Sequence, residues 1–178
     1  TLRTDFNGNA TRFKYDDYGR VIAVTDANGT KMEMPRDKVG QVLSSEDALG
    51  RETAFTYDDM GNVLTESYAG QTKRYTYDDN NNRLSQTDWE GRKVTFKYNN
   101  ANQLIKETYP LNKSITYLRD GNGNATQETL AYGSERYITN REFDFKNRLT
   151  SETDAEGHEQ SWKYDHSNNL VEFRNKNG

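Results

Sequence analysis

Residues 57–64 read Tyr-Asp-Asp-Met-Gly-Asn-Val-Leu, and this stretch opens the pattern that decides the fold. The same phase returns along the whole chain, usually as a Tyr-Asp pair, with Tyr98-Asn99 and Phe143-Asp144 as variants and arginine in place of tyrosine at two positions. The first residues of the pairs are Tyr15, Arg36, Tyr57, Tyr77, Tyr98, Arg119, Phe143 and Tyr164. Their spacings of 21, 21, 20, 21, 21, 24 and 21 residues identify a repeat protein.

A second marker, Asp-x-x-Gly, runs in step with the first and lies about midway between the pairs. Asn81 and Asn102 replace the glycine of two Tyr-Asp turns, and the extra residues of the longest cycle predict a longer loop or a bulge within 130–142. The residues that define the repeat are Tyr15, Asp16, Gly19, Asp26, Gly29, Asp47, Gly50, Tyr57, Asp58, Gly61, Tyr77, Asp78, Asp88, Gly91, Tyr98, Phe143, Asp144, Asp154, Gly157, Tyr164 and Asp165.

Each cycle contains two short alternating segments separated by turn signals. Residues 11–15 place Phe13 and Tyr15 on one side and two basic residues on the other, a period of two that predicts a strand. Asp16 caps the following turn and Gly19 supplies the positive φ of a type I turn with a bulge, before a β-branched return strand at 21–25. We therefore predict an all-β fold, a long antiparallel meander of about 16 short strands, which must twist and curl.

The composition limits the class of protein. The 178 residues are 31% hydrophobic with a mean hydropathy of −1.16, too polar for an ordinary core. A net charge of −4 and 12% aromatic residues argue against disorder, and the lack of a basic cluster argues against nucleic-acid binding. No apolar run approaches 18 residues, so we expect no membrane-spanning helix, and zero cysteines exclude disulfides and thiolate metal sites.

The repeat unit Tyr-Asp-x-x-Gly-Asn-x-Leu at residues 57–64, together with the Asp-x-x-Gly marker, resembles the YD repeat of the RHS family. This family includes bacterial RHS toxins, the C subunits of Tc toxin complexes, wall-associated proteins and teneurins. The resemblance implies a β-sheet strip that spirals into a hollow shell, which in bacterial members encloses a C-terminal toxin domain. It implies a secreted or cell-surface location, with the remainder of the parent chain and the enclosed toxin or effector as partners.

The organisation predicted is one YD-repeat array over residues 1–178, about eight cycles long. Residues 175–178 occupy the Asp-x-x-Gly slot of a ninth cycle, so we expect a fragment of a longer polypeptide. Such a strip has exposed sheet edges, and we expect these edges to self-associate.

The chemistry-bearing residues favour a non-enzymatic function. Adjacent carboxylates such as Asp16-Asp17 lie in turn-capping positions, and His158 and His166 lie in turns. Residues 120–124 resemble the start of a calcium loop, but Ala125 and Ala131 stand where that loop needs glycine and glutamate. We predict no catalytic residue, cofactor or metal. The alternative function is a carbohydrate- or receptor-binding adhesion module, with Trp89 and Trp162 as candidate glycan contacts.

Overall fold

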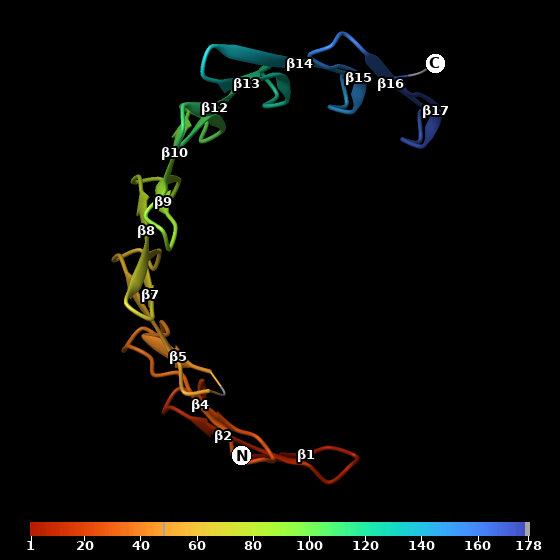
Figure 1. Cartoon of the computed structure of the whole chain (residues 1–178). Coiled ribbons are helices and arrows are strands. Elements are labelled where there is room, and N and C mark those ends of the chain that lie inside the picture. The colour runs from red at the N-terminus through yellow and green to blue at the C-terminus, as the bar shows by residue number, and fades with distance from the viewer. Residues whose placement is uncertain (48, 177–178) are drawn as a thin grey trace. The chain divides into compact units, whose positions relative to one another are not determined.

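The computed structural model describes residues 1–47 and 49–176, and it confirms the all-β prediction. The chain divides into two compact units, one comprising residues 1–77 and 85–92 and the other residues 78–84 and 93 onward. No helix able to span a membrane occurs in the described residues. Figure 1 labels the strands.

The first unit is built from short strands that pair with their neighbours in chain order. The first four form one antiparallel sheet, and pairing resumes from the fifth to the eighth. These strands are β1 (Leu2–Thr4), β2 (Ala10–Tyr15), β3 (Val21–Thr25), β4 (Lys31–Glu33), β5 (Ser44–Glu46), β6 (Glu52–Tyr57), β7 (Val63–Tyr68) and β8 (Gln71–Tyr77). Strand β9 (Arg83–Thr87) has residues in both units.

The second unit continues the same antiparallel, consecutive pairing. Its strands are β10 (Lys93–Tyr98), β11 (Leu104–Tyr109), β12 (Lys113–Arg119), β13 (Ala125–Tyr132), β14 (Glu135–Phe143), β15 (Leu149–Thr153), β16 (Glu159–Tyr164) and β17 (Leu170–Arg174). The strands at 10–15 and 21–25 agree with the predicted segments to within one residue.

A β-bulge precedes the first residue of the Tyr-Asp pair in hairpin after hairpin. The register shifts between Thr56 and Tyr57, between Lys97 and Tyr98, and between Leu118 and Arg119. The same shift occurs before Tyr15, Phe143 and Tyr164. The bulge predicted at the Tyr-Asp turn therefore recurs along the repeat, and arginine or phenylalanine in place of the tyrosine does not remove it.

The prediction of a longer loop within 130–142 was wrong. The extra residues lengthen β13 to eight residues and β14 to nine, and their register runs without a shift from Gln127↔Asn140 to Tyr132↔Glu135. The bulge at Glu142 and Phe143 is the one that the other Tyr-Asp hairpins share. When the extra residues extend both strands, they form additional hydrogen bonds between the strands. A longer loop would not form these bonds.

The ladder is interrupted between β4 and β5. Here Leu43 donates its N–H to the Pro35 carbonyl over 2.7 Å, and a single bridge joins Arg36 to Val42. Proline has no N–H to return, so a regular pairing cannot continue past it. The first sheet therefore ends at β4.

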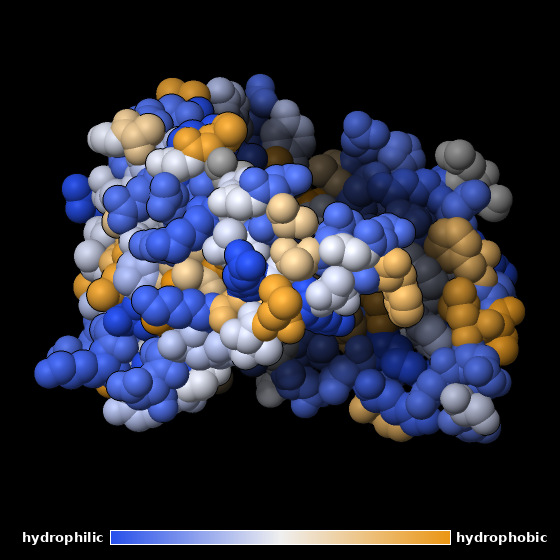
Figure 2. All heavy atoms as spheres, turned by 90° about the horizontal axis from the view of Figure 1, so that it is seen from below, coloured by the Kyte–Doolittle hydropathy of each residue, from blue (hydrophilic) through white to orange (hydrophobic). Residues whose placement is uncertain are grey.

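The described residues contain almost no buried core. The buried hydrophobic residues are Ala23 and Ala131, Ser85 is the buried polar one, and no large side chain is fully buried. Figure 2 shows hydrophobic residues interspersed among hydrophilic ones on the face in view. Stability must therefore come chiefly from the strand ladder, cross-strand pairs and loop contacts.

Candidate functional site

Most of the repeat-defining residues lie in the hairpin loops. The loop at 58–62 is a representative example. Asp58 Oδ1 accepts the N–H groups of Met60 (3.0 Å) and Asn62 (2.8 Å), and Asp58 Oδ2 accepts the Asn62 side-chain amide (3.0 Å). In the backbone, the Asp58 N–H donates to the Asn62 carbonyl and the Gly61 N–H to the Asp58 carbonyl. One aspartate thus satisfies the polar groups of the whole turn.

The same backbone pattern recurs at both kinds of loop. Loops of this type begin at Asp5, Asp16, Asp26, Asp37, Asp47, Asp58, Asp78, Asp88, Asn99, Asp120, Asp144, Asp154 and Asp165. The fourth residue has a positive φ in each, which glycine adopts without strain and asparagine tolerates, as at Asn81 (64°) and Asn102 (57°). This confirms that the aspartates cap turns, and it explains why asparagine can replace the turn glycine.

Hydrogen bonding favours the charged form of several of these carboxylates. At Asp58 the Asn62 side-chain bond lowers the pKa of the carboxyl, and the backbone N–H groups of Asn62 and Met60 add to this against the opposing effect of desolvation. The pKa values of Asp120 and Asp165 are lowered in the same way, with the amides of Asn124 and Asn169 as the largest cause. These carboxylates are therefore acceptors in fixed turns and are poorly suited to proton transfer.

In several cycles the first residue of the Tyr-Asp pair bonds its hairpin to the preceding one. The Tyr57 hydroxyl donates to the Val42 carbonyl (2.8 Å), and the Tyr98 hydroxyl donates to the Arg83 carbonyl (3.1 Å). In each case the acceptor lies 15 residues earlier in the chain. The tyrosine is therefore a cross-hairpin hydrogen-bond donor as well as an aromatic contact.

Arginine performs the same task where it replaces tyrosine. Arg36 Nε donates to the Val21 carbonyl (3.1 Å) and Arg119 Nε to the Leu104 carbonyl (2.9 Å), again 15 residues back. Each guanidinium also donates through Nη1 to a carbonyl of its own loop, at Gly40 or Gly123. The two arginines are thus functional equivalents of the repeat tyrosine, with one additional bond.

In several Tyr-Asp loops the last residue reaches the positive-φ residue of the next such loop. Where that residue is asparagine, its side chain accepts a hydrogen bond, as from Asn82 to Asn102 (2.9 Å) and from Asn124 to Asn147 (2.9 Å). Where it is glycine, the donor lies over it: a Cβ at Gly40 would clash with the Arg20 guanidinium, and one at Gly123 with the Gln103 amide. We call this set of contacts the loop ladder.

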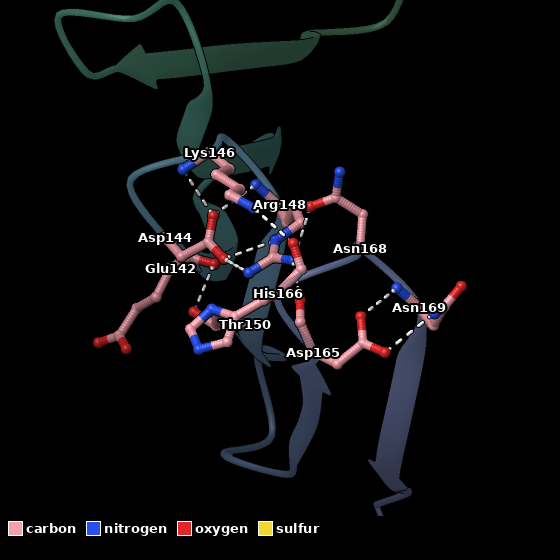
Figure 3. A network of polar contacts seen from close by, with 9 residues as sticks. All are labelled: Glu142, Asp144, Lys146, Arg148, Thr150, Asp165, His166, Asn168 and Asn169. Carbon is pink, nitrogen blue, oxygen red and sulfur yellow. Dashed lines mark hydrogen bonds and ion pairs between the residues drawn. The ribbon is translucent and has the colours of Figure 1, made fainter.

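Figure 3 shows the last step of the loop ladder, between the β14–β15 and β16–β17 loops. Arg148 forms an ion pair with Asp144 and donates through Nη1 to the Asp165 carbonyl (3.0 Å) and to Asn168 Oδ1 (3.0 Å). Lys146 adds a bond to the His166 carbonyl (3.0 Å). The two loops are therefore cross-linked by cationic side chains from the first one.

The Asp-x-x-Gly loops lie at the opposite ends of the strands and are more open. A Cβ added at Gly8, Gly29, Gly91 or Gly157 would meet no atom within 4 Å. Three connections at this end are tight turns that lack the aspartate cap, and one of them places Ala69 and Gly70 at φ 50° and 80°. This end carries fewer contacts between successive loops than the Tyr-Asp end: Lys176 bonds Asp154 (2.6 Å), and the Gly133 N–H donates to the Asn112 carbonyl (3.2 Å).

Polar clusters on the sheet also join neighbouring strands. Glu107 accepts hydrogen bonds from the hydroxyls of Tyr109 and Tyr117, and its bond raises the pKa of Tyr109 to about 12. Arg141 bridges Glu152 (2.8 Å) and Glu128 (3.3 Å). These half-buried clusters cross-link β11 to β12 and β13 to β15 through β14.

The structure places the other candidate residues in structural contacts. Lys73 Nζ lies 4.3 Å from the ring centre of half-buried Trp89, and Trp162 packs against Phe173 with ring centres 5.6 Å apart. Both Asp120 carboxylate oxygens accept hydrogen bonds from N–H groups of the same loop. No group of three or more histidine, cysteine or acidic residues able to hold a metal occurs in the described residues.

Sequence reasoning located the loop aspartates and glycines but missed the loop ladder. Its signal is a pairing between residues about 20 positions apart, such as Gln103 with Gly123 and Asn82 with Asn102. Sequence reasoning also treated Arg36 and Arg119 as departures from the repeat. A long side chain that ends in N–H donors can, however, replace a phenol in this position.

These contacts define a repeat protein made of consecutive hairpins that are fastened to one another along one edge. The family model described as RHS Repeat matches residues 1–31 and 36–73. This match agrees with the resemblance of the repeat to the RHS family. A search of curated proteins found no match.

A solved structure shows the same fold. A Tc holotoxin pore from Photorhabdus luminescens has a TM-score of 0.59 at 15% identity, covering 98% of this chain and 12% of that chain. The crystal structure titled TcdB2-TccC3-Cdc42 has a TM-score of 0.47 at 19% identity, covering 93% of this chain and 12% of that chain. The chain therefore spans about an eighth of the length of these proteins.

Proposed function

We propose that this array is a non-enzymatic wall segment of a secreted or cell-surface bacterial protein, and that the wall encloses a toxin or effector domain of the same parent chain. The observation that carries the proposal is the cross-linked Tyr-Asp edge. Within each unit, apart from the break between β4 and β5, neighbouring hairpins are joined by strand pairing, and several are also joined by bonds from residues such as Tyr57 and Arg119 and by loop-ladder contacts such as that of Asn124 with Asn147. Such a sheet can form a barrier without a hydrophobic core.

The likeness of fold to a Tc holotoxin chain supports the same proposal. A protease needs an extended segment of its substrate, and a domain behind a closed hydrogen-bonded wall presents none until the wall opens. The wall's task is therefore physical exclusion, and it requires no catalytic group in the array.

Protease protection in the full-length parent protein tests this proposal. A recognition site for a sequence-specific protease is inserted into the C-terminal domain, and its cleavage rate is compared with that of the same domain expressed alone. Enclosure predicts cleavage at least about tenfold slower in the parent, as for a site reached only through opening of a folded structure. Equal rates would refute enclosure and would leave only a structural or display role.

A further inference from the structure

Exposed apolar side chains follow one another along the Tyr-Asp loops of the first unit. The third loop residues are Tyr18, Val39 and Met60, with exposed fractions of 77%, 78% and 62%. At the same position, the later loops carry Asn80, Ala101, Asn122, Lys146 and Ser167. Isolated exposed hydrophobic residues are common, but here one position is apolar on three consecutive loops and small or polar afterwards. We call Tyr18, Val39 and Met60 the tip row.

The loops that carry the tip row are held against one another. The Arg20 guanidinium lies 4.9 Å from the ring centre of Tyr18 and also covers Gly40, next to Val39. Gln41 Nε2 would lie 3.2 Å from a Cβ at Gly61, next to Met60. The loop ladder therefore fixes the three tips in sequence, so that a partner would meet an ordered surface.

The spacing of the tip row suits a helix. The strand ladder is interrupted between β4 and β5, but the contacts of Arg20 with Gly40 and of Gln41 with Gly61 keep consecutive loops adjacent. Successive tips are therefore about two strand spacings, roughly 10 Å, apart. Residues seven apart on one face of an α-helix are separated by about 10.5 Å. Residues on one face of an extended strand repeat at about 6.7 and 13.4 Å, which does not match.

The net negative charge of the three loops favours a basic partner. They contain five carboxylates against two cations, Arg20 and Lys38. The carboxylates are those of Asp16, Asp17, Asp37, Asp58 and Asp59. A second copy of this edge, related by a two-fold axis, would place Asp17 opposite Asp59 and Lys38 opposite Lys38, which is repulsive.

We propose that the tip row is a docking surface for a basic amphipathic helix of a partner protein. Apolar side chains seven residues apart on the helix would contact Tyr18, Val39 and Met60, and flanking lysines or arginines would face the loop carboxylates. This proposal does not depend on enclosure, because the tip row lies at the loop edge of the sheet whatever the sheet surrounds.

A defined helical peptide tests the proposal with the full chain. The probe is a fluorescent 21-residue peptide with leucine at every seventh position, flanking lysines and helix-forming alanines, and the control is a peptide of equal composition with the leucines out of register. Anisotropy should show binding of the probe and not of the control. V39S, or M60S as a second variant, should weaken the dissociation constant by about tenfold, the effect of losing one central apolar contact.

The matched control variant is L49S, because Leu49 is 76% exposed in an Asp-x-x-Gly loop at the other edge. It should leave the dissociation constant unchanged. Equal binding of the two peptides, or equal effects of V39S and L49S, would overturn the proposal. So would self-association in sedimentation that V39S abolishes, since this would identify a second copy as the occupant.

Discussion

At the scale of the residue, the surroundings of a turn glycine depend on a side chain about 20 residues away in the sequence. Gly123 and Gly157 have similar φ values, 91° and 86°, but only Gly123 is covered by a side chain of the preceding Tyr-Asp loop, that of Gln103. Each is the fourth residue of an Asp-x-x-Gly stretch, so the sequence alone does not separate them. The difference arises from which loops become neighbours in space.

We predict that Gly123→Ala destabilises the chain more than Gly157→Ala. Both substitutions add the cost of a positive φ, about 1–2 kcal/mol, but the new Cβ at residue 123 also displaces the Gln103 amide. This displacement should add about 1 kcal/mol, the value of one hydrogen-bonding contact. Urea unfolding measures the difference, and equal losses of unfolding free energy in the two variants would refute the loop ladder as a source of stability.

Arg119 gives a second prediction at this scale. Arg119→Leu removes the bonds to the Leu104 and Gly123 carbonyls and should lower the free energy of unfolding by about 1–2 kcal/mol. Arg119→Tyr should retain most of the stability, because Tyr57 and Tyr98 make the equivalent bond. If the tyrosine variant is as unstable as the leucine variant, the two residue types are not equivalent at this position.

At the scale of the element, the tight turn between β7 and β8 carries a local strain. Ala69 adopts a φ of 50° in a two-residue turn that favours Asn-Gly. Ala69→Asn should therefore raise the free energy of unfolding by roughly 0.5–1 kcal/mol, since asparagine tolerates this conformation better. Ala101→Asn is the control because Ala101 has no positive φ, and a gain of equal size there would attribute the effect to something other than strain.

Most elements could be predicted from the sequence because alternation and turn chemistry are local properties. The strands at 10–15 and 21–25 and the capped loops follow from residues within a few positions of one another. The extended pairing of β13 with β14 could not be predicted, since a longer loop and two longer strands need the same number of residues. Only the register between the strands separates these alternatives.

At the scale of the whole molecule, many capping carboxylates respond to pH together. The pKa values of Asp58, Asp78 and Asp120 lie below the ordinary value in the folded chain, with the side-chain bonds from Asn62, Asn82 and Asn124 as the largest causes. A lowered pKa adds stability above the unfolded value, near 3.9, and this stability is lost as pH falls through the folded values. The chain should therefore unfold progressively below about pH 4.

Circular dichroism across pH 2–7 measures this dependence. Replacing Asp58 and Asp120 with asparagine should make the stability of the chain depend less on pH in the acid range. The natural loop at Asn99 shows that an amide oxygen can accept the same two backbone hydrogen bonds. An unchanged acid limb in the double variant would show that other groups control acid unfolding.

The central claim is that the loop ladder stabilises a wall that encloses the C-terminal domain, and one protease measurement tests it most directly. It compares the cleavage rate of a protease site within the C-terminal domain of the full-length parent in three forms: wild type, Gly123→Ala and Gly157→Ala. We predict slow cleavage in the wild type, a clear acceleration in Gly123→Ala and a smaller one in Gly157→Ala, because opening of the wall limits access. Cleavage at the rate of the free domain in all three forms would contradict the account.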